Sequence, residues 1–319
     1  MRTGPAPRAG PGDMTMTRSW FEDIRERRGE AGLALVLIAP AVFLIGAVNL
    51  YPVGYSVYQS LFDIHGLVNR GFVGVQNYVD LLTSEQLHRS LGATAYFTLG
   101  AVLFQTGAGL AIALALNVPF RGNYLVRSLL IIPWAIPSAL GALMWQRFFS
   151  SVDGFVNATL RNVGLLKGDI NWFLDPWLAM TAVIWVDSWK MTPLYAIIFL
   201  AALQAIPKDL YESAAIAGAN RWQAFRFVTL PILMPIVVIV LILRMVLVFQ
   251  AFDFIYILTD GGPGDSTRVI AFYAYQEAFQ FLERGRGAAV AVIIFVCTVA
   301  ITVLYAAIVR IGRLGGSGR

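Results

Sequence analysis

The segment that decides the fold is Tyr211–Pro231, which reads YESAAIAGANRWQAFRFVTLP. It lies between two strongly apolar stretches, where only a short polar turn is expected. Its run of small residues, the glycine at 218 and the aromatic residues that follow predict a helix, a break and a second short helix. A compact, ordered element at this place indicates a docking surface for another protein.

The first of these helices has suitable residues at both ends. Pro207 fits its first turn, because proline lacks only an amide hydrogen that would be unpaired there. Asp209 and Glu212 place negative charge near the positive N-terminal end of the helix, and Gly218 fits the left-handed position that follows a helix end. On these features alone, an ordinary helical hairpin that packs back on the rest of the chain is an equally good interpretation.

Composition places the whole chain in a membrane. Hydrophobic residues make up 58% of the chain and charged residues 13%, which is about half the charged share of a soluble domain. A membrane-spanning helix needs about 20 apolar residues. Six stretches of the sequence meet this requirement, two of them interrupted by charged residues: Ala31–Phe62, Ser90–Phe120, Ser128–Gln146, Pro176–Leu203, Phe227–Leu258 and Gly287–Val309. The sequence therefore predicts an all-α polytopic membrane protein with six transmembrane helices.

The distribution of Lys and Arg predicts the orientation in the membrane, because cytoplasmic loops are enriched in these residues. Most of them lie in the two termini and in the second-to-third and fourth-to-fifth loops. We therefore expect residues 1–30 to form a cytoplasmic tail, 31–310 a transmembrane domain with a cytoplasmic loop at 205–231, and 311–319 a second cytoplasmic tail. Residues 1–17 are rich in Gly, Pro and Arg and are expected to be disordered, and Arg18–Glu30 forms either a surface helix or a solvated linker.

Two further features narrow the expectations. Pro133 and Pro137 lie four residues apart at the start of the third stretch, which predicts a distorted helix that faces protein rather than lipid. The single cysteine, Cys297, excludes a disulfide framework. With only His65 and His88 in one predicted external loop, neither a bound metal nor another cofactor is expected on this chain.

The order of residues in the 205–231 loop resembles the cytoplasmic signature loop of permease subunits in binding-protein-dependent ABC importers. That pattern runs Glu-Ala-Ala, two residues, Asp-Gly-Ala, then Phe and finally Ile-x-Leu-Pro. The matching residues are Glu212, Ala214, Gly218, Ala219, Phe225, Leu230 and Pro231. Ser213, Ala217 and Val228 replace the family's alanine, aspartate and isoleucine, and the lost aspartate removes a possible cap for the second helix.

The resemblance implies an ABC importer type I permease architecture, in which this loop forms a coupling helix that lodges in a cleft of an ATPase subunit. The implied coupling residues are Glu212, Ser213, Ala214, Ala215, Gly218, Ala219, Phe225, Leu230 and Pro231. The chain has no G-x-x-x-x-G-K-[ST] phosphate loop. We therefore expect a transport subunit rather than an enzyme, with ATP and Mg²⁺ bound by the partner ATPase.

Charged residues within two predicted spans indicate a polar cargo, because charges at bilayer depth usually face the bundle interior or a water-filled cavity. Asp187 and Lys190 share one face of the fourth span, and Arg244 lies near the middle of the fifth. Trp185 and Trp189 add aromatic faces that suit a sugar ring. An ion pair of Asp187 with Lys190 or Arg244 that only holds helices together is the alternative, and the two roles are compatible.

From about Leu35 to Arg310 the chain is most similar to the carbohydrate branch of these permeases, the maltose type. Segments that carry this resemblance include Trp189–Pro193, Phe252–Thr259 with Gly261–Gly264, and Arg127–Trp134. The resemblance places the sugar-contacting positions on the fourth and fifth spans, at Asp187, Lys190, Met191, Leu194, Arg244, Leu247 and Val248.

The resemblance therefore implies a permease subunit of a sugar importer in a bacterial or archaeal cell membrane. Its implied partners are a second homologous permease, two ATPase subunits and an extracytoplasmic sugar-binding protein. An ABC importer for another polar cargo, such as glycerol phosphate or a polyamine, would share the loop. A secondary carrier or a channel is the remaining alternative.

Overall fold

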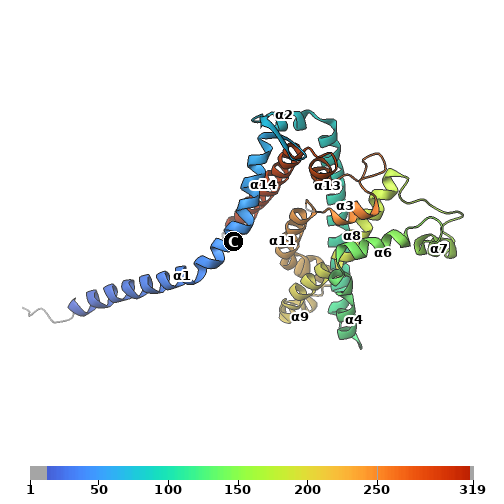
Figure 1. Cartoon of the computed structure of the whole chain (residues 1–319). Helices are drawn as coiled ribbons and strands as arrows, with labels where there is room; N and C mark the ends of the chain where they lie inside the picture. The colour runs from blue at the N-terminus through green and yellow to red at the C-terminus, as the bar shows by residue number, and fades with distance from the viewer. Residues whose placement is uncertain (1–12, 250, 317–319) are drawn as a thin grey trace, which may run out of the picture. The chain divides into compact units, whose positions relative to one another are not determined.

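The chain folds almost entirely into helices in the computed structural model, which describes residues 13–249 and 251–316 (Figure 1). It divides into two compact units, Met1–Tyr55 and Ser56–Arg319. The elements are α1 (Asp13–Ser60), β1 (Phe62–His65), β2 (Val68–Phe72), α2 (Gln76–Thr83), α3 (Glu85–Asn117), α4 (Asn123–Leu130), α5 (Ile132–Ala135), α6 (Ser138–Phe148), α7 (Phe155–Asn162), α8 (Pro176–Gln204), α9 (Lys208–Ile216), α10 (Arg221–Ala224), the π-helical turn η1 (Phe225–Thr229), α11 (Leu230–Val248), α12 (Asp253–Leu258), α13 (Ile270–Tyr275), the π-helical turn η2 (Gln276–Gln280) and α14 (Arg284–Gly316).

The first unit consists of α1 up to Tyr55 in its described part. The helix begins at Asp13, so the prediction of disorder up to residue 17 is wrong for its last residues, while residues 1–12 lie outside the described part. The helix breakers Pro11 and Gly12 directly precede its first residue. The helix also continues through Pro52, because an apolar segment has no water with which to pair an unfolded backbone.

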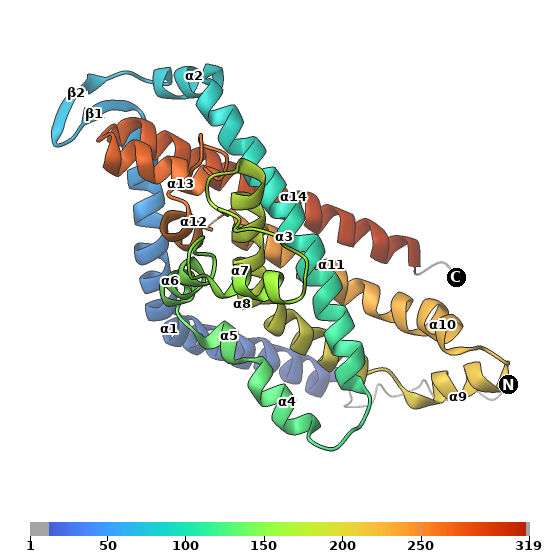
Figure 2. The same cartoon turned by 90° about the vertical axis from the view of Figure 1, so that its right-hand side faces the viewer.

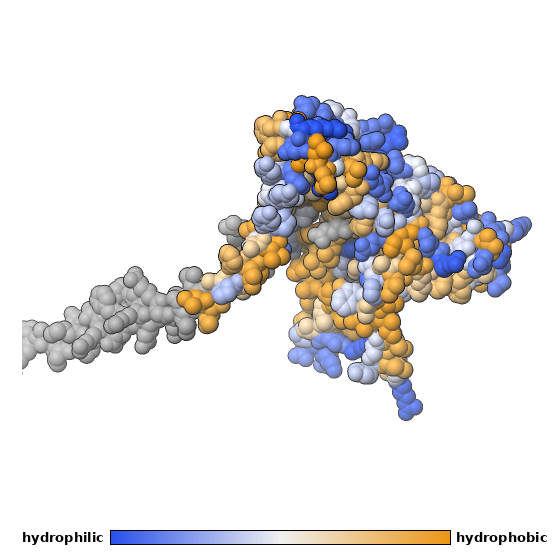
Figure 3. Space-filling model, in the orientation of Figure 1, coloured by the Kyte–Doolittle hydropathy of each residue, from blue (hydrophilic) through white to orange (hydrophobic). Residues whose placement is uncertain are grey.

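Five helices of the described chain are long and apolar enough to cross a membrane, and a bent pair brings the number to six if it counts as one span. The five are Val36–Ser60, Glu85–Asn117, Pro176–Gln204, Arg221–Val248 and Arg284–Tyr305. Figure 3 shows hydrophilic residues gathered over α2 at one end of the second unit and over α9 at the other, with hydrophobic residues between them. The predicted all-α membrane fold is confirmed, and the β1–β2 hairpin is the one sheet among the described residues.

The third predicted span is the bent pair. Asn123–Ala135 and Ser138–Phe148 meet at an angle of 95°, and the break falls at Ile136 and Pro137, where the backbone is extended. Pro137 lacks the amide hydrogen needed to continue the helix and disfavours helical backbone at the residue before it. The distortion predicted from the paired prolines is confirmed.

The fifth span is shorter than predicted. It ends at Val248 rather than at Leu258, and Asp253 begins the separate helix α12. An acidic residue is well placed in the first turn of a helix because it faces the positive end of the helix dipole. Asp253 is therefore the start of a new element and does not lie inside the fifth span.

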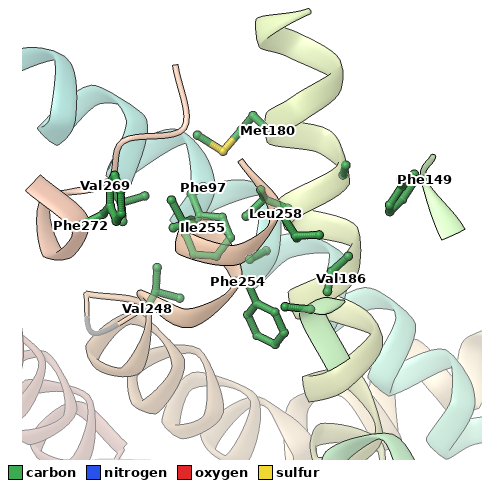
Figure 4. Packing of buried hydrophobic residues seen from close by; sticks show 14 residues of the cluster. Phe97, Phe149, Met180, Val186, Val248, Phe254, Ile255, Leu258, Val269 and Phe272 are labelled. Atoms are coloured by element: carbon green, nitrogen blue, oxygen red, sulfur yellow. The ribbon is translucent and has the colours of Figure 1, made fainter. Parts of the chain in front are cut away.

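The core of the second unit is built around α3 and α8, which make the most extensive helix–helix contact of the described chain (Figures 1 and 2). Gly109 permits this approach, since a Cβ atom there would lie 3.2 Å from Tyr195 Cβ and 3.3 Å from Ala196 N. A hydrophobic cluster then joins these helices to α12 and α13, and its members include Phe97, Val186, Val248, Ile255 and Phe272 (Figure 4). These contacts fix the helix faces that carry the buried polar residues.

Candidate functional site

A buried polar cluster lies where α3, α8 and α11 meet, and we define it as Gln105, Asp187, Ser188 and Arg244. Asp187 is only 2% exposed and Arg244 only 3%, and Arg244 Nη2 donates to Asp187 Oδ2 in an ion pair. Gln105 Nε2 donates to Asp187 Oδ2 at 2.8 Å and to Ser188 Oγ at 3.2 Å. The carboxylate therefore receives hydrogen bonds from two other helices.

The cluster retains unused hydrogen-bonding capacity. Gln105 Oε1 and Arg244 Nε have no hydrogen-bond partner among the described residues, although both atoms are buried. Unpaired polar atoms inside a protein carry a desolvation cost of about 1–3 kcal/mol each. Within this cluster, one acceptor and one donor are thus left over, a combination that suits hydroxyl groups.

Lys190 does not join this ion pair. Its Nζ donates to the carbonyl oxygen of Ile136, which lies at the break between α5 and α6. This carbonyl lies after the last turn of α5 and directly before Pro137. The break therefore leaves it without a hydrogen-bond donor from a helix backbone. Lys190 therefore ties α8 to the bent third span.

The remaining predicted cargo positions have varied surroundings. Met191 is partly buried and packs on the cluster that contains Tyr195 and Phe199, and Leu194 is half-buried. Leu247 is 37% exposed, whereas Val248 is buried in the hydrophobic cluster of Figure 4. The structure brings Asp187 and Arg244 together, whereas each of the other predicted positions has different neighbours.

Gln105 was not singled out by the sequence analysis, yet it is fully buried and contacts Asp187. A signal for it exists in the sequence. The uncharged second span carries four polar residues at helical spacing, and all four are buried: Ser90, Thr94, Thr98 and Gln105. A polar stripe on one face of a membrane helix indicates contact with protein rather than lipid.

The helices α9 and α10 form an exposed pair at the end of the second unit opposite to α2 (Figure 2). No residue of either helix is buried. Gly218 adopts φ +80° between them, which confirms the predicted left-handed break. Tyr211 and Thr229 anchor the pair through hydroxyl groups 3.0 Å apart.

The second helix of this pair is capped without the family's aspartate. The Asn220 side chain accepts a hydrogen bond from Gln223 N at 2.9 Å, and Gln223 Oε1 accepts one from Asn220 N at 2.8 Å. This reciprocal capping box supplies the cap that Ala217 cannot. No role was predicted for Asn220 from the sequence, and the effect of Ala217 on the second helix stayed open there.

The predicted coupling residues lie mainly on the outside of this pair. Glu212, Ser213, Ala215 and Gly218 are exposed, and Ala214 and Ala219 are half-buried. Phe225 and Leu230 are half-buried and Pro231 is exposed at the junction with α11. Trp222 is 65% exposed and lies 5.6 Å, between ring centroids, from Phe225. This is an accessible surface with both charged and apolar groups, rather than a hairpin packed on the bundle.

The exposed pair and the buried ion pair are directly connected along the chain. The helix that carries Asp187, α8, leads at its C-terminal end into α9. The α10 helix continues through η1 into α11, which carries Arg244. Both partners of the buried ion pair therefore lie on helices that are continuous along the chain with the exposed pair. Among the residues whose side chains the structure describes, no group of three or more His, Cys, Asp or Glu is placed to hold a metal ion.

Comparison with known proteins places these features in a family. Residues 106–311 match the family described as binding-protein-dependent transport system inner membrane component. The chain is 34% identical over 285 residues to the trehalose/maltose transport system permease protein MalF of Thermococcus litoralis, a match that covers 89% of this chain and 95% of the relative. It is 37% identical over 285 residues to the sulfoquinovosyl glycerol transport system permease protein SmoG of Agrobacterium fabrum, which covers 88% and 92%.

Solved structures agree on the fold. A bacterial ABC transporter involved in the import of the acidic polysaccharide alginate has a chain that superimposes with a TM-score of 0.77 at 24% identity. The superposition covers 92% of this chain and 98% of that chain. Because the family match spans more than half of the sequence and the relatives cover nearly all of it, this chain belongs to the binding-protein-dependent inner membrane components, the permease subunits of ABC importers.

Proposed function

We propose that this permease carries a sugar, as one half of the translocation pathway of an ATP-driven importer. The observation that carries this proposal is the identity of 34% and 37%, over nearly the whole chain, with permeases named for trehalose or maltose and for sulfoquinovosyl glycerol. The buried cluster supports it, because Gln105 and Arg244 retain an acceptor and a donor for hydroxyl groups.

The other half of the pathway would be a second, homologous permease. Two ATPase subunits would bind ATP and Mg²⁺, since this chain lacks a phosphate loop. An extracytoplasmic binding protein would deliver the sugar. This agrees with a structurally similar protein that is described as an alginate transporter in complex with a periplasmic protein. Both termini and the exposed helix pair would face the cytoplasm, as the distribution of Lys and Arg predicts.

Coupling would run through the exposed helix pair. Closure of the ATPase subunits would push on the surface around Glu212, and α8 and α11 would transmit the push to Asp187 and Arg244. The buried ion pair would then separate in part of the cycle and expose its charges to the pathway, together with Lys190, Met191, Leu194, Leu247 and Val248. Separation of a buried ion pair is costly unless new partners replace it, and sugar hydroxyl groups are such partners.

The test is uptake by cells that express this chain with the proteins encoded beside it. Radiolabelled trehalose, maltose, sulfoquinovosyl glycerol and alginate oligosaccharides are the probes, with glycerol phosphate and a polyamine for comparison. We expect uptake of at least one sugar and co-purification of an ATPase subunit. Uptake of only glycerol phosphate or the polyamine would refute the sugar assignment, and purification without any ATPase would refute the coupling scheme.

A charge reversal tests the coupling surface itself. Glu212→Arg is expected to leave the complex assembled and to abolish sugar-stimulated ATP hydrolysis. The matched control is Glu85→Arg, at the start of α3, where an exposed glutamate pairs with Arg89 of its own helix. If Glu212→Arg supports the same uptake as the control, Glu212 has no role in coupling.

A further inference from the structure

A second cavity lies away from the buried cluster, near the β1–β2 hairpin. Its volume is about 610 Å³, within the range of about 300–1,000 Å³ that is usual for small-molecule sites. Its walls come from the last turn of α1, the segment before α12, the α13–η2 helix and the first turns of α14. Figures 1 and 2 show α13 and the start of α14 beside the hairpin.

One wall of this cavity is a row of aromatic rings. Phe252 and Tyr275 have ring centroids 4.9 Å apart, and Tyr275 and Phe279 have centroids 5.4 Å apart. Phe279 is 66% exposed, so the row extends from the interior to the open surface. Neighbouring rings of the row are inclined to one another by 58° and 31°, so the row offers both ring faces and ring edges, and the C–H groups of a ring-shaped ligand pack on the negative faces.

Polar groups face the same cavity. Arg284 and Gln59 line it, and neither side chain has a hydrogen bond or an ion pair with another residue in the described part of the chain. Arg284 offers five N–H donors and Gln59 offers donors and an acceptor. A lipid acyl chain in this cavity would leave these groups unpaired, at a desolvation cost, whereas a hydroxyl-rich ligand would satisfy them.

The aromatic wall is held rigidly from behind. It includes the π-helical turn η2, a form of helix that is frequent at functional sites. Glu277 of this turn is 4% exposed and pairs with Arg286 at 3.2 Å. On the other side, a Cβ atom on Gly287 would lie 2.6 Å from Ala278 Cβ, so α14 packs directly on η2. The rings are thus presented on a supported surface, as a preformed site requires.

We propose that this cavity is an additional sugar-binding subsite, which receives the cargo at this end of the molecule before it reaches the buried cluster. The sugar ring would stack on Phe252, Tyr275 and Phe279, and its hydroxyl groups would bind Arg284 and Gln59. The inference rests on the proposed sugar cargo, and it adds a second site for that cargo. The guanidinium of Arg284 also suits a carboxylate or sulfonate group of an acidic sugar.

Photo-crosslinking in the assembled importer tests the subsite. The probe is a diazirine derivative of whichever sugar the wild-type importer takes up, and the labelled peptides are mapped by mass spectrometry. We expect labelling within residues 270–291 that unlabelled sugar competes away. Phe279→Ala and Arg284→Gln are expected to lower this labelling about tenfold, as the loss of one contact with a charged or aromatic group predicts, and Phe279→Tyr should retain it.

The matched control is Phe281→Ala, because Phe281 is exposed on the same segment but does not line the cavity. Normal labelling in Phe279→Ala and Arg284→Gln, or labelling that unlabelled sugar does not compete, overturns the subsite even if sugar uptake is normal. Uptake of none of the sugars by the wild-type importer overturns the proposed cargo and the subsite together. The amount of co-purified ATPase shows that each variant is assembled.

Discussion

Asp187 on α8 and Arg244 on α11 form an ion pair in which both side chains are almost completely removed from solvent. Charges in such a position are stabilising only as a pair, because each alone would pay its full desolvation cost. The pair therefore joins two membrane helices, and the proposed function requires that its charges become exposed to the pathway.

Removing one partner should be far more damaging than removing both. Asp187→Leu or Arg244→Met alone should lower the free energy of unfolding by about 3–5 kcal/mol, since an unpaired charge remains buried. The double variant should recover most of this loss in thermal unfolding of the purified complex, yet it should not recover sugar uptake. If uptake also recovers, the pair serves only helix packing.

Gln105→Leu tests the third member of the cluster. The substitution removes the donor that lies 2.8 Å from Asp187 Oδ2, and the expected loss is about 1–3 kcal/mol of unfolding free energy. Thr98→Val on the same face of α3 is the control, because the Thr98 hydroxyl donates only to the Thr94 carbonyl of its own helix. An equal effect of the two variants in a thermal unfolding assay would contradict a specific role for Gln105.

The capping box predicts the effect of restoring the family's aspartate. Asn220→Ala should destabilise the second helix of the exposed pair by about 1 kcal/mol and lower sugar-stimulated ATP hydrolysis. Ala217→Asp should leave that hydrolysis near the wild-type rate, because Asn220 already caps the helix. A clear gain of activity in Ala217→Asp would show that the aspartate acts through a contact other than the cap.

Substitutions of Gly218 distinguish the effect of backbone strain from the effect of steric crowding. A Cβ atom there would meet nothing within 4 Å, yet φ is +80°, so a larger residue is strained but not crowded. Gly218→Val should weaken coupling, with a conformational cost of at least about 1–2 kcal/mol. Gly218→Asn should be close to wild type, because asparagine tolerates left-handed backbone. ATPase assays on the assembled complex compare the two, and equal loss would show that the partner surface itself excludes any side chain.

The close approach of α3 and α8 gives a prediction for stability. Gly109→Val places atoms against Tyr195 and the backbone of Ala196, and overpacking of this kind costs about 1–3 kcal/mol. Gly107→Val is a control on the same helix, since nothing lies within 4 Å of its Cβ position. The midpoint of thermal unfolding should fall for the first variant by clearly more than for the second.

The elements could be predicted largely from local sequence. Long apolar stretches must become helices in a membrane, because their backbone groups have no water to bind, and the spacing of Pro133 and Pro137 predicted a distorted third span. The predicted helix boundaries were wrong where a short polar signal interrupts an apolar stretch. Asp253, for example, begins a new helix instead of lying within the fifth span. The exposed helix pair was predictable because Gly218 and the residues around it act within a few positions of one another.

The sequence by itself determined the membrane fold, the family and the presence of charges at bilayer depth, because these depend on composition and on spacing along single helices. Only the tertiary structure decided which charges meet. Asp187 is three residues from Lys190, yet it pairs with Arg244 and Gln105 on other helices, and Lys190 binds the carbonyl at a proline break. Such contacts join residues far apart in the chain, so they follow from how helices pack and from how each buried polar group finds its partner.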